Sequence, residues 1–149
     1  MIPSPPLEKR TYGPDSIPSE CLKIKEYINV YENNVILYHE LPVVSLFTVG
    51  LFKEKLNDIF KNGERFFFII DLTNSERPNA EERDALRDLF KFFAKSIIHV
   101  TVYVGNNFLL KIACKFVLGT IFHKKISVHS TLKESLLEIE TLRGQTVLK

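Results

Sequence analysis

The stretch that decides the fold is Phe66-Phe67-Phe68-Ile69-Ile70-Asp71-Leu72, an apolar run that only Asp71 interrupts. A run of this length is typical of a strand that is covered on both faces. A second β-rich run, IIHVTVYV at 97–104, follows it after a stretch with helical spacing at 79–95. Because strands that alternate with helices need crossover connections, the two runs predict a largely parallel sheet.

The periodicity of the remaining sequence supplies the other elements. In chain order the predicted elements are strands 22–31 and 35–40, helix 46–62, strand 66–72, helix 79–95, strand 97–104, helix 108–122, strand 125–129 and a helix from 131 to about 144. Asn33 and Asn34 tolerate left-handed geometry and predict a hairpin between the first two strands. Gly63 stands where a helix C-terminal cap belongs. The predicted fold is therefore an α/β domain of order β-β-α-β-α-β-α-β-α, with a mixed, mostly parallel central sheet that begins with a β-hairpin.

Composition narrows the class of protein. The chain has 149 residues, of which 45% are apolar and 26% are charged, as expected for one globular domain. Five of the seven prolines lie in residues 1–20, so we predict a proline-rich N-terminal arm there and a single domain over 21–145. The net charge of +2 is too small for the basic footprint of a nucleic-acid binder. With no signal-peptide pattern, no run of about 18 apolar residues and only two distant cysteines, we expect a cytoplasmic protein.

Three segments carry a resemblance to a known family. They are FIIDLTNSERPNAEER at 68–83, TVYVGNNFLLKIACKFVLG at 101–119 and ISVHSTLKESL at 126–136. Together they resemble the STAS domain, and most closely its divergent SpoIIAA/Sec14-like members, related to bacterial anti-sigma factor antagonists; the likeness spans about 24–142. It implies a non-enzymatic bacterial regulatory module that binds a protein partner. In such antagonists a Ser or Thr at a helix N-terminus is phosphorylated, whereas the corresponding position here is near Ala80.

The loop and helix start at 71–83 form the first candidate site. Ligands gather at the carboxyl ends of strands in α/β sheets, and a helix N-terminus attracts anions. The residues that we expect to bind a protein partner are Asp71, Thr73, Asn74, Ser75, Arg77 and Arg83. Thr73 and Ser75 are possible phosphorylation sites. The alternative is that capping and turn roles account for these residue types without any partner.

The helix predicted at 108–122 is the second candidate site. Its apolar side chains cover more than the roughly 100° that an ordinary surface helix buries, which leaves only a narrow stripe with Lys111 and Lys115. The residues expected to form an apolar interface are Phe108, Ile112, Phe116, Ile121 and Phe122. They predict a homodimer contact, an apolar ligand, or a lipid or membrane surface that the protein binds peripherally; the alternative is burial within the monomer, under the N-terminal arm.

Catalytic and metal-binding patterns are missing from the sequence. No HExxH, P-loop, GxGxxG or GxSxG motif occurs, so we predict a protein that is not an enzyme and needs neither a metal nor a cofactor. His99 and His129 lie in strand-like runs and are interpreted as structural imidazoles that neighbour each other if those strands pair. Cys114 is interpreted as a small buried apolar residue.

Overall fold

A five-stranded sheet forms the centre of the computed structural model, which describes residues 6–74, 76 and 79–148. The strand order is β1-β2-β3-β4-β5; β1 pairs with β2 antiparallel and every other pair is parallel. The strands are β1 Ile28–Glu32, β2 Val35–His39, β3 Phe66–Asp71, β4 Ile97–Tyr103 and β5 Ile126–His129. The helices are α1 Pro18–Lys25, α2 Leu46–Phe60, α3 Ala80–Phe93, the 3₁₀ turn η1 Ala94–Ser96, α4 Phe108–Phe122 and α5 Leu132–Leu148. The predicted α/β class with a mixed, mostly parallel sheet is confirmed.

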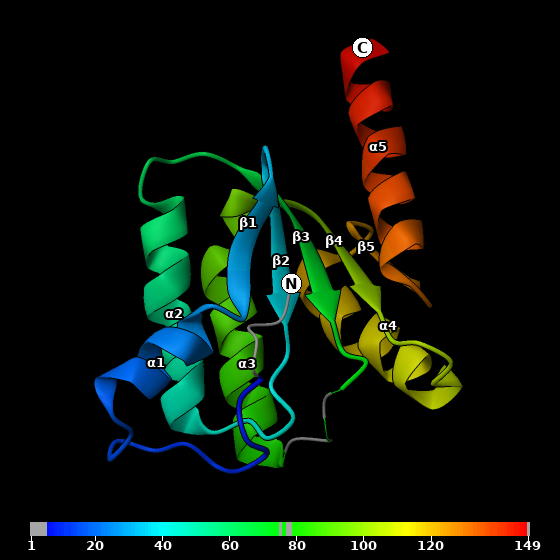
Figure 1. Ribbon diagram of the computed structural model, residues 1–149. Helices are drawn as coiled ribbons and strands as arrows, with labels where there is room; N and C mark the ends of the chain where they lie inside the picture. The colour runs from blue at the N-terminus through cyan, green and yellow to red at the C-terminus, as the bar shows by residue number, and fades with distance from the viewer. Residues whose placement is uncertain (1–5, 75, 77–78, 149) are drawn as a thin grey trace.

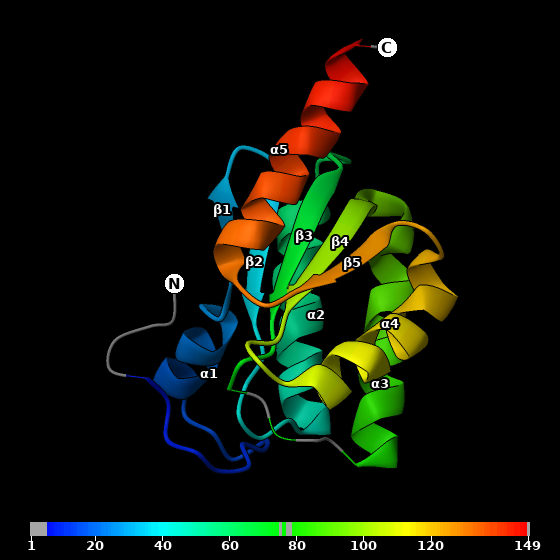
Figure 2. The ribbon, with the colours of Figure 1, turned by 90° about the vertical axis from the view of Figure 1, so that its right-hand side faces the viewer.

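The two faces of the sheet are covered unequally. Side chains such as Ile36, Tyr38 and Phe68 point into the larger core beneath α1 to α4. The alternate side chains, such as Leu37 and Phe67, form a smaller cluster with Ile139 of α5. Figure 2 shows α5 crossing in front of the sheet with α2 and α3 behind it, and in both ribbon views the end of α5 extends beyond the sheet (Figure 1). One helix therefore covers the face that the first four leave open.

Strand β3 has the central position that its apolar run predicts. All six of its residues are buried, and it pairs with β2 on one side and β4 on the other. The register aligns His39 with Asp71, Asp71 with Tyr103, and Tyr103 with His129. Because aligned residues of neighbouring strands share a face, a row of polar side chains crosses the carboxyl edge of the parallel strands.

The first predicted strand is wrong over residues 22–25, which belong to helix α1. The two-residue spacing of Leu22 and Ile24 suggested alternation, but Leu22 is exposed and Ile24 is fully buried, as on two sides of a helix. Pro18 occupies the first helical position, where its fixed φ favours helix formation, and Glu20 accepts a hydrogen bond from the Ile17 N–H. The element order therefore begins with a helix before the hairpin.

The N-terminal segment from residue 6 lies against the domain. Tyr12 is only 3% exposed and belongs to the larger core, and the Leu7 N–H donates to the Tyr27 hydroxyl. The last part of the predicted arm, residues 18–20, is the first turn of α1. The arm thus contributes to the core rather than only covering it.

Several predicted boundaries are confirmed by the caps. Asn79 and Glu82 exchange the hydrogen bonds of a capping box at the start of α3, and Thr131 accepts from the Glu134 N–H at the start of α5. Gly63 has a φ of +75° just after α2. The predicted end of the last helix near Gly144 is wrong, because α5 continues to Leu148. No helix in the described part of the chain has the length and apolar character needed to span a membrane.

Candidate docking site

Asp71 is the last residue of β3, and its hydrogen bonds position the first candidate site. Its Oδ2 accepts a hydrogen bond from His39 Nδ1 at 2.6 Å, and both side chains are more than nine-tenths buried. Its Oδ1 accepts from the backbone N–H of Thr73 at 2.9 Å and from the Thr73 hydroxyl at 2.6 Å. Burial alone would raise the pKa of Asp71, but the hydrogen bonds from His39 and Thr73 outweigh it and lower that pKa. Both carboxylate oxygens are thus used inside the molecule.

The segment after Asp71 is tied down at several points. The Leu72 N–H donates to the Tyr103 carbonyl at 3.1 Å, and the Glu76 N–H donates to the Pro42 carbonyl at 3.1 Å. Glu76 also forms an ion pair with Lys9 from the N-terminal segment. These contacts connect the loop to β4, to the loop after β2 and to the N-terminal segment, so its described part has a defined position.

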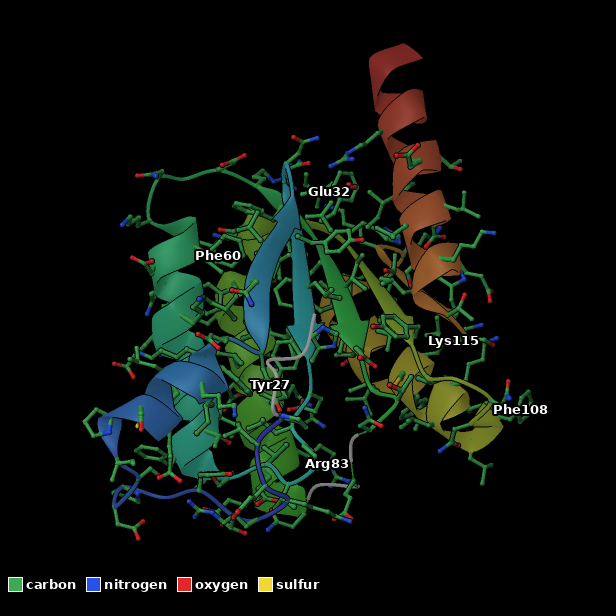
Figure 3. The ribbon with its side chains drawn as sticks, viewed as in Figure 1. Tyr27, Glu32, Phe60, Arg83, Phe108 and Lys115 are labelled. Atoms are coloured by element: carbon green, nitrogen blue, oxygen red, sulfur yellow. The ribbon has the colours of Figure 1, made fainter. Side chains whose placement is uncertain are left out.

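The predicted partner-binding residues differ in what they expose. Thr73 and Asn74 are exposed, although the Thr73 hydroxyl is engaged by Asp71. Arg83 is half-buried in the first turns of α3, where Figure 3 shows it near the lower end of that helix. The predicted residues Ser75 and Arg77 lie outside the described residues. Thr73 and Asn74 are therefore the described members of the set with exposed side chains at this loop.

Two neighbours of this site, His39 and Glu40, were not predicted from the sequence. His39 is the last residue of β2, and its place beside Asp71 follows once β2 and β3 are paired in parallel register. The Glu40 carboxylate is buried and accepts a hydrogen bond from the Tyr38 hydroxyl at 2.9 Å and another from the Leu41 N–H at 3.2 Å. Burial raises the pKa of Glu40 to about 7 despite these two bonds. The sequence signal was the polar pair that ends the apolar run VILYHE.

Helix α4 presents the second candidate site. Four of its large apolar side chains are more than half exposed; we call them the α4 apolar face: Phe108 (70%), Leu109 (78%), Ile112 (52%) and Phe116 (78%). At 100° per residue these four lie on one side of the helix, with Lys115 and then Lys111 along one edge. Figure 3 shows Phe108 at the outer end of α4, away from the sheet.

The other side of α4 belongs to the core. Cys114, Leu118 and Phe122 are buried, and the Phe122 ring lies 6.3 Å from the Phe90 ring, centroid to centroid. Of the residues predicted to form an apolar interface, Phe122 is therefore inside the domain, and Ile121 is half-buried against the core. Burial raises the pKa of the Cys114 thiol to about 11, in keeping with its interpretation as an apolar residue.

The two candidate sites adjoin each other. Gly105, in the turn that leads into α4, has a φ of +66°, and a Cβ placed on it would lie 3.8 Å from Thr73 Cγ2. Asn107 then caps α4 by accepting from the Leu110 N–H at 3.0 Å. The exposed end of the 71–83 loop and the first turn of α4 are consequently neighbours at the carboxyl edge of the sheet.

His99 and His129 form a separate cluster under α5. His99 Nε2 lies 3.0 Å from Ser127 Oγ, and His129 Nε2 lies 3.1 Å from Glu138 Oε1. The two histidines share Glu138, whose carboxylate lies 3.5 Å from His99 Nε2. Their predicted proximity is confirmed, and the cluster connects α5 to the sheet. Among the described residues, no group of three or more His, Cys, Asp and Glu side chains is arranged to hold a metal ion.

Comparison with known proteins supports the fold. No protein-family model and no curated protein matches the sequence. Among solved structures, the chain is similar to the NMR structure of the protein TM1081, with a TM-score of 0.55 and 14% identity. The similarity covers 76% of this chain and 86% of that chain. At this level of identity the likeness shows a shared fold.

Proposed function

We propose that this chain is a non-enzymatic, STAS-like binding module that recognises its partner through the α4 apolar face. The observation that supports the proposal most strongly is the exposure of Phe108, Leu109, Ile112 and Phe116 on one side of one helix. The fold likeness to a solved α/β structure and the three sequence segments are consistent with a STAS-like module. The expected location is the cytoplasm.

The clustering of these side chains is the reason to treat them as a surface for binding. The described residues include eleven exposed large apolar side chains, and four of them fall within residues 108–116. Scattered exposed apolar residues are normal, whereas a contiguous patch marks an interaction surface. Side chains that leave water on binding contribute about 25 cal/mol per Å² of buried apolar area, so this face has the most to gain from a partner.

Photocrosslinking in cells tests this proposal. A benzophenone amino acid at position 116 is expected to form adducts with a partner, protein or lipid. The same group at position 137, an apolar residue that is 58% exposed on α5, is the matched control. Adducts from position 116 that disappear in an Ile112→Glu background would support the proposal. Equal adduct formation at 116 and 137, or none at 116, would refute it.

The loop at 71–83 is a second candidate for docking a protein partner. Its support is the proximity of Thr73 to Gly105, in the turn before α4, together with the hydrogen bonds that fix Asp71 and Glu76. If the partner docks on this loop, Thr73 contacts the partner or is phosphorylated beside the α4 apolar face. Negative charge added at Thr73 then alters binding of the partner. A Thr73→Glu variant that retains all the adducts formed from position 116 would argue against a contribution from this loop.

A further inference from the structure

We propose that the α4 apolar face binds a membrane surface, and that it selects bilayers that carry anionic lipid headgroups. This inference rests on the proposed function, because it names the partner of the same face. A bilayer surface has an apolar layer that can take up the large side chains of the α4 apolar face. The anionic headgroups directly above that layer can pair with the lysines near this face.

The charges of the chain are segregated along the sequence. Residues 89–133 contain seven lysines and no Asp or Glu, whereas the remaining residues contain 13 basic and 18 acidic side chains. The segment runs from the end of α3 through η1, β4, α4 and β5 to the start of α5. Although the net charge of the whole chain is only +2, this stretch of sequence is cationic, and it includes the whole of α4.

Four of these seven lysines lie in α4 or directly after it. Lys115 is exposed at the edge of the face, two turns after Phe108 along the helix, and Lys111 is half-buried beside it. Lys124 and Lys125 are exposed directly after the last turn of α4. This is the arrangement of a helix that lies in the plane of a membrane interface, with aromatic and aliphatic side chains inward and lysines at headgroup level.

A shallow groove at the C-terminal end of α4 has the same composition. It has a volume of about 400 Å³, and Ala94, Ile97, Ile121 and Phe122 supply its apolar lining. His123, Lys124 and Lys125 complete the lining. Apolar surface next to cations therefore occurs at this end of the helix as well as along the exposed face.

A second copy of the chain fits this surface less well. If two α4 helices packed face to face and antiparallel, the edges that carry Lys111 and Lys115 would lie on the same side, and α4 supplies no acid to pair with them. Like charges at an interface oppose association. Charge complementarity therefore favours an anionic occupant over a homodimer formed through α4.

Vesicle binding by single-tryptophan variants tests the inference directly. The chain has no tryptophan, so Phe116→Trp places a unique fluorophore on the face and Leu137→Trp places one on α5 as the control. The vesicles are phosphatidylcholine alone, and phosphatidylcholine in which about a third of the lipid is phosphatidylglycerol. We expect the Phe116→Trp emission to shift to shorter wavelength only with the anionic vesicles, and the shift to weaken as salt is added, while Leu137→Trp does not respond.

Flotation of further variants separates the two components of the interaction. Ile112→Glu in the otherwise native chain should reduce flotation with anionic vesicles by about tenfold or more, because it places a charge in the apolar layer. Lys115→Glu combined with Lys124→Glu should abolish the preference for anionic vesicles. Leu137→Glu should float like the native protein. Circular dichroism and thermal unfolding verify that each variant is folded.

Several outcomes would overturn the membrane inference. The first is a folded native protein that floats with neither vesicle, the second is equal binding by Ile112→Glu, and the third is a Phe116→Trp shift caused by self-association without lipid. Photocrosslinks from position 116 to a protein, without vesicle binding, would also refute it, but they would leave the proposed binding function of α4 standing. Absence of both crosslinks and vesicle binding would remove both proposals.

Discussion

The polar corner formed by His39, Asp71 and Thr73 lies beside the α4 apolar face. The two regions differ in whether their side chains find partners within the protein. At the corner the Asp71 carboxylate is engaged inside the molecule, since both of its oxygens accept hydrogen bonds from His39 and Thr73. The α4 face holds apolar groups that water surrounds, with Phe116 and Leu109 each 78% exposed. A polar loop thus serves the stability of the fold, while an apolar helix face remains available for binding. Residue type alone would suggest the opposite assignment.

The largest expected contrast lies within α4 itself. Phe122→Ala should lower the free energy of unfolding by about 4 kcal/mol, because it leaves a cavity where Phe122 packs against Phe90. Phe116→Ala should change it by less than about 0.5 kcal/mol, because that ring is exposed. Urea unfolding followed by circular dichroism measures both values. Similar losses for the two variants would mean that Phe116 is also packed in the core, and the α4 face would cease to be a free surface.

The difference between Phe116 and Phe122 also shows where prediction from sequence ends. The apolar run FFFIIDL, the pair Asn79 and Glu82 with capping spacing, and the glycine at position 63 are local sequence signals, so the sheet and most helix ends followed from them. A helix that is apolar around most of its circumference gives no local signal for which side faces the core. That choice depends on residues such as Phe90, which contacts Phe122 but is distant from it in sequence. Helix α1 was missed because a spacing of two fits Leu22 and Ile24 in a strand, while their opposite burial appears only after folding.

The candidate site was only partly predictable for a related reason. Asp71 and Thr73 were identified from their place after a buried strand, but their mutual hydrogen bonds and the contact with His39 depend on strand pairing. Had the parallel register of β2 and β3 been assumed, His39 would have followed as the neighbour of Asp71. The exposure of Thr73 beside Gly105 depends on how two loops meet, which no local pattern encodes.

The second prediction concerns the corner. Asp71→Ala should cost about 3 kcal/mol of unfolding free energy, because it leaves His39 Nδ1 and the Thr73 N–H without their buried acceptor. Asn74→Ala, at an exposed neighbouring position, is the control and should stay within about 0.5 kcal/mol. Denaturant unfolding near neutral pH measures both. A neutral effect of Asp71→Ala would show that the corner is not an internal anchor and would return it to the candidates for partner contact.

The third prediction compares Asp71 with Glu40, the other buried acid of this corner, whose N–H donates to the Asp71 carbonyl. The pKa of Glu40 is raised from the ordinary value of 4.5 to about 7, so the fold favours its protonated form. This favourable contribution is complete below pH 4.5 and is lost as pH rises to about 7. Glu40→Gln should therefore stabilise the protein by about 2 to 3 kcal/mol at alkaline pH and have little effect in acid.

Unfolding measured across pH provides the check for Glu40. The native protein should lose stability between about pH 4.5 and 7, and the Glu40→Gln variant should lose less over that range. Glu64→Gln, at an exposed site, should follow the native profile. Asp71 acts in the opposite direction: its pKa is lowered, so its contribution is present above its ordinary value of 3.8 and is lost as pH falls below that. Parallel profiles for the native protein and Glu40→Gln would contradict the raised pKa.

The smallest predicted effect concerns α5, which covers the other face of the sheet. Glu138→Ala should cost about 1 kcal/mol, because its carboxylate is a quarter exposed and bonds to His129 at the surface of the cluster. Burial alone would raise the pKa of Glu138, but hydrogen bonds from Ser127 and His129 outweigh burial and lower that pKa. The contribution of Glu138 to the free energy of unfolding is therefore lost as pH falls below its ordinary pKa of 4.5. Hydrogen exchange of the α5 amides should speed up in this variant and not in Glu140→Ala, whose side chain is exposed. Because α5 and α4 lie on different faces of the sheet, this loosening should leave vesicle binding by α4 unchanged. A parallel loss of vesicle binding would mean that the face in contact with lipid includes α5, and the binding surface would then have to be redrawn.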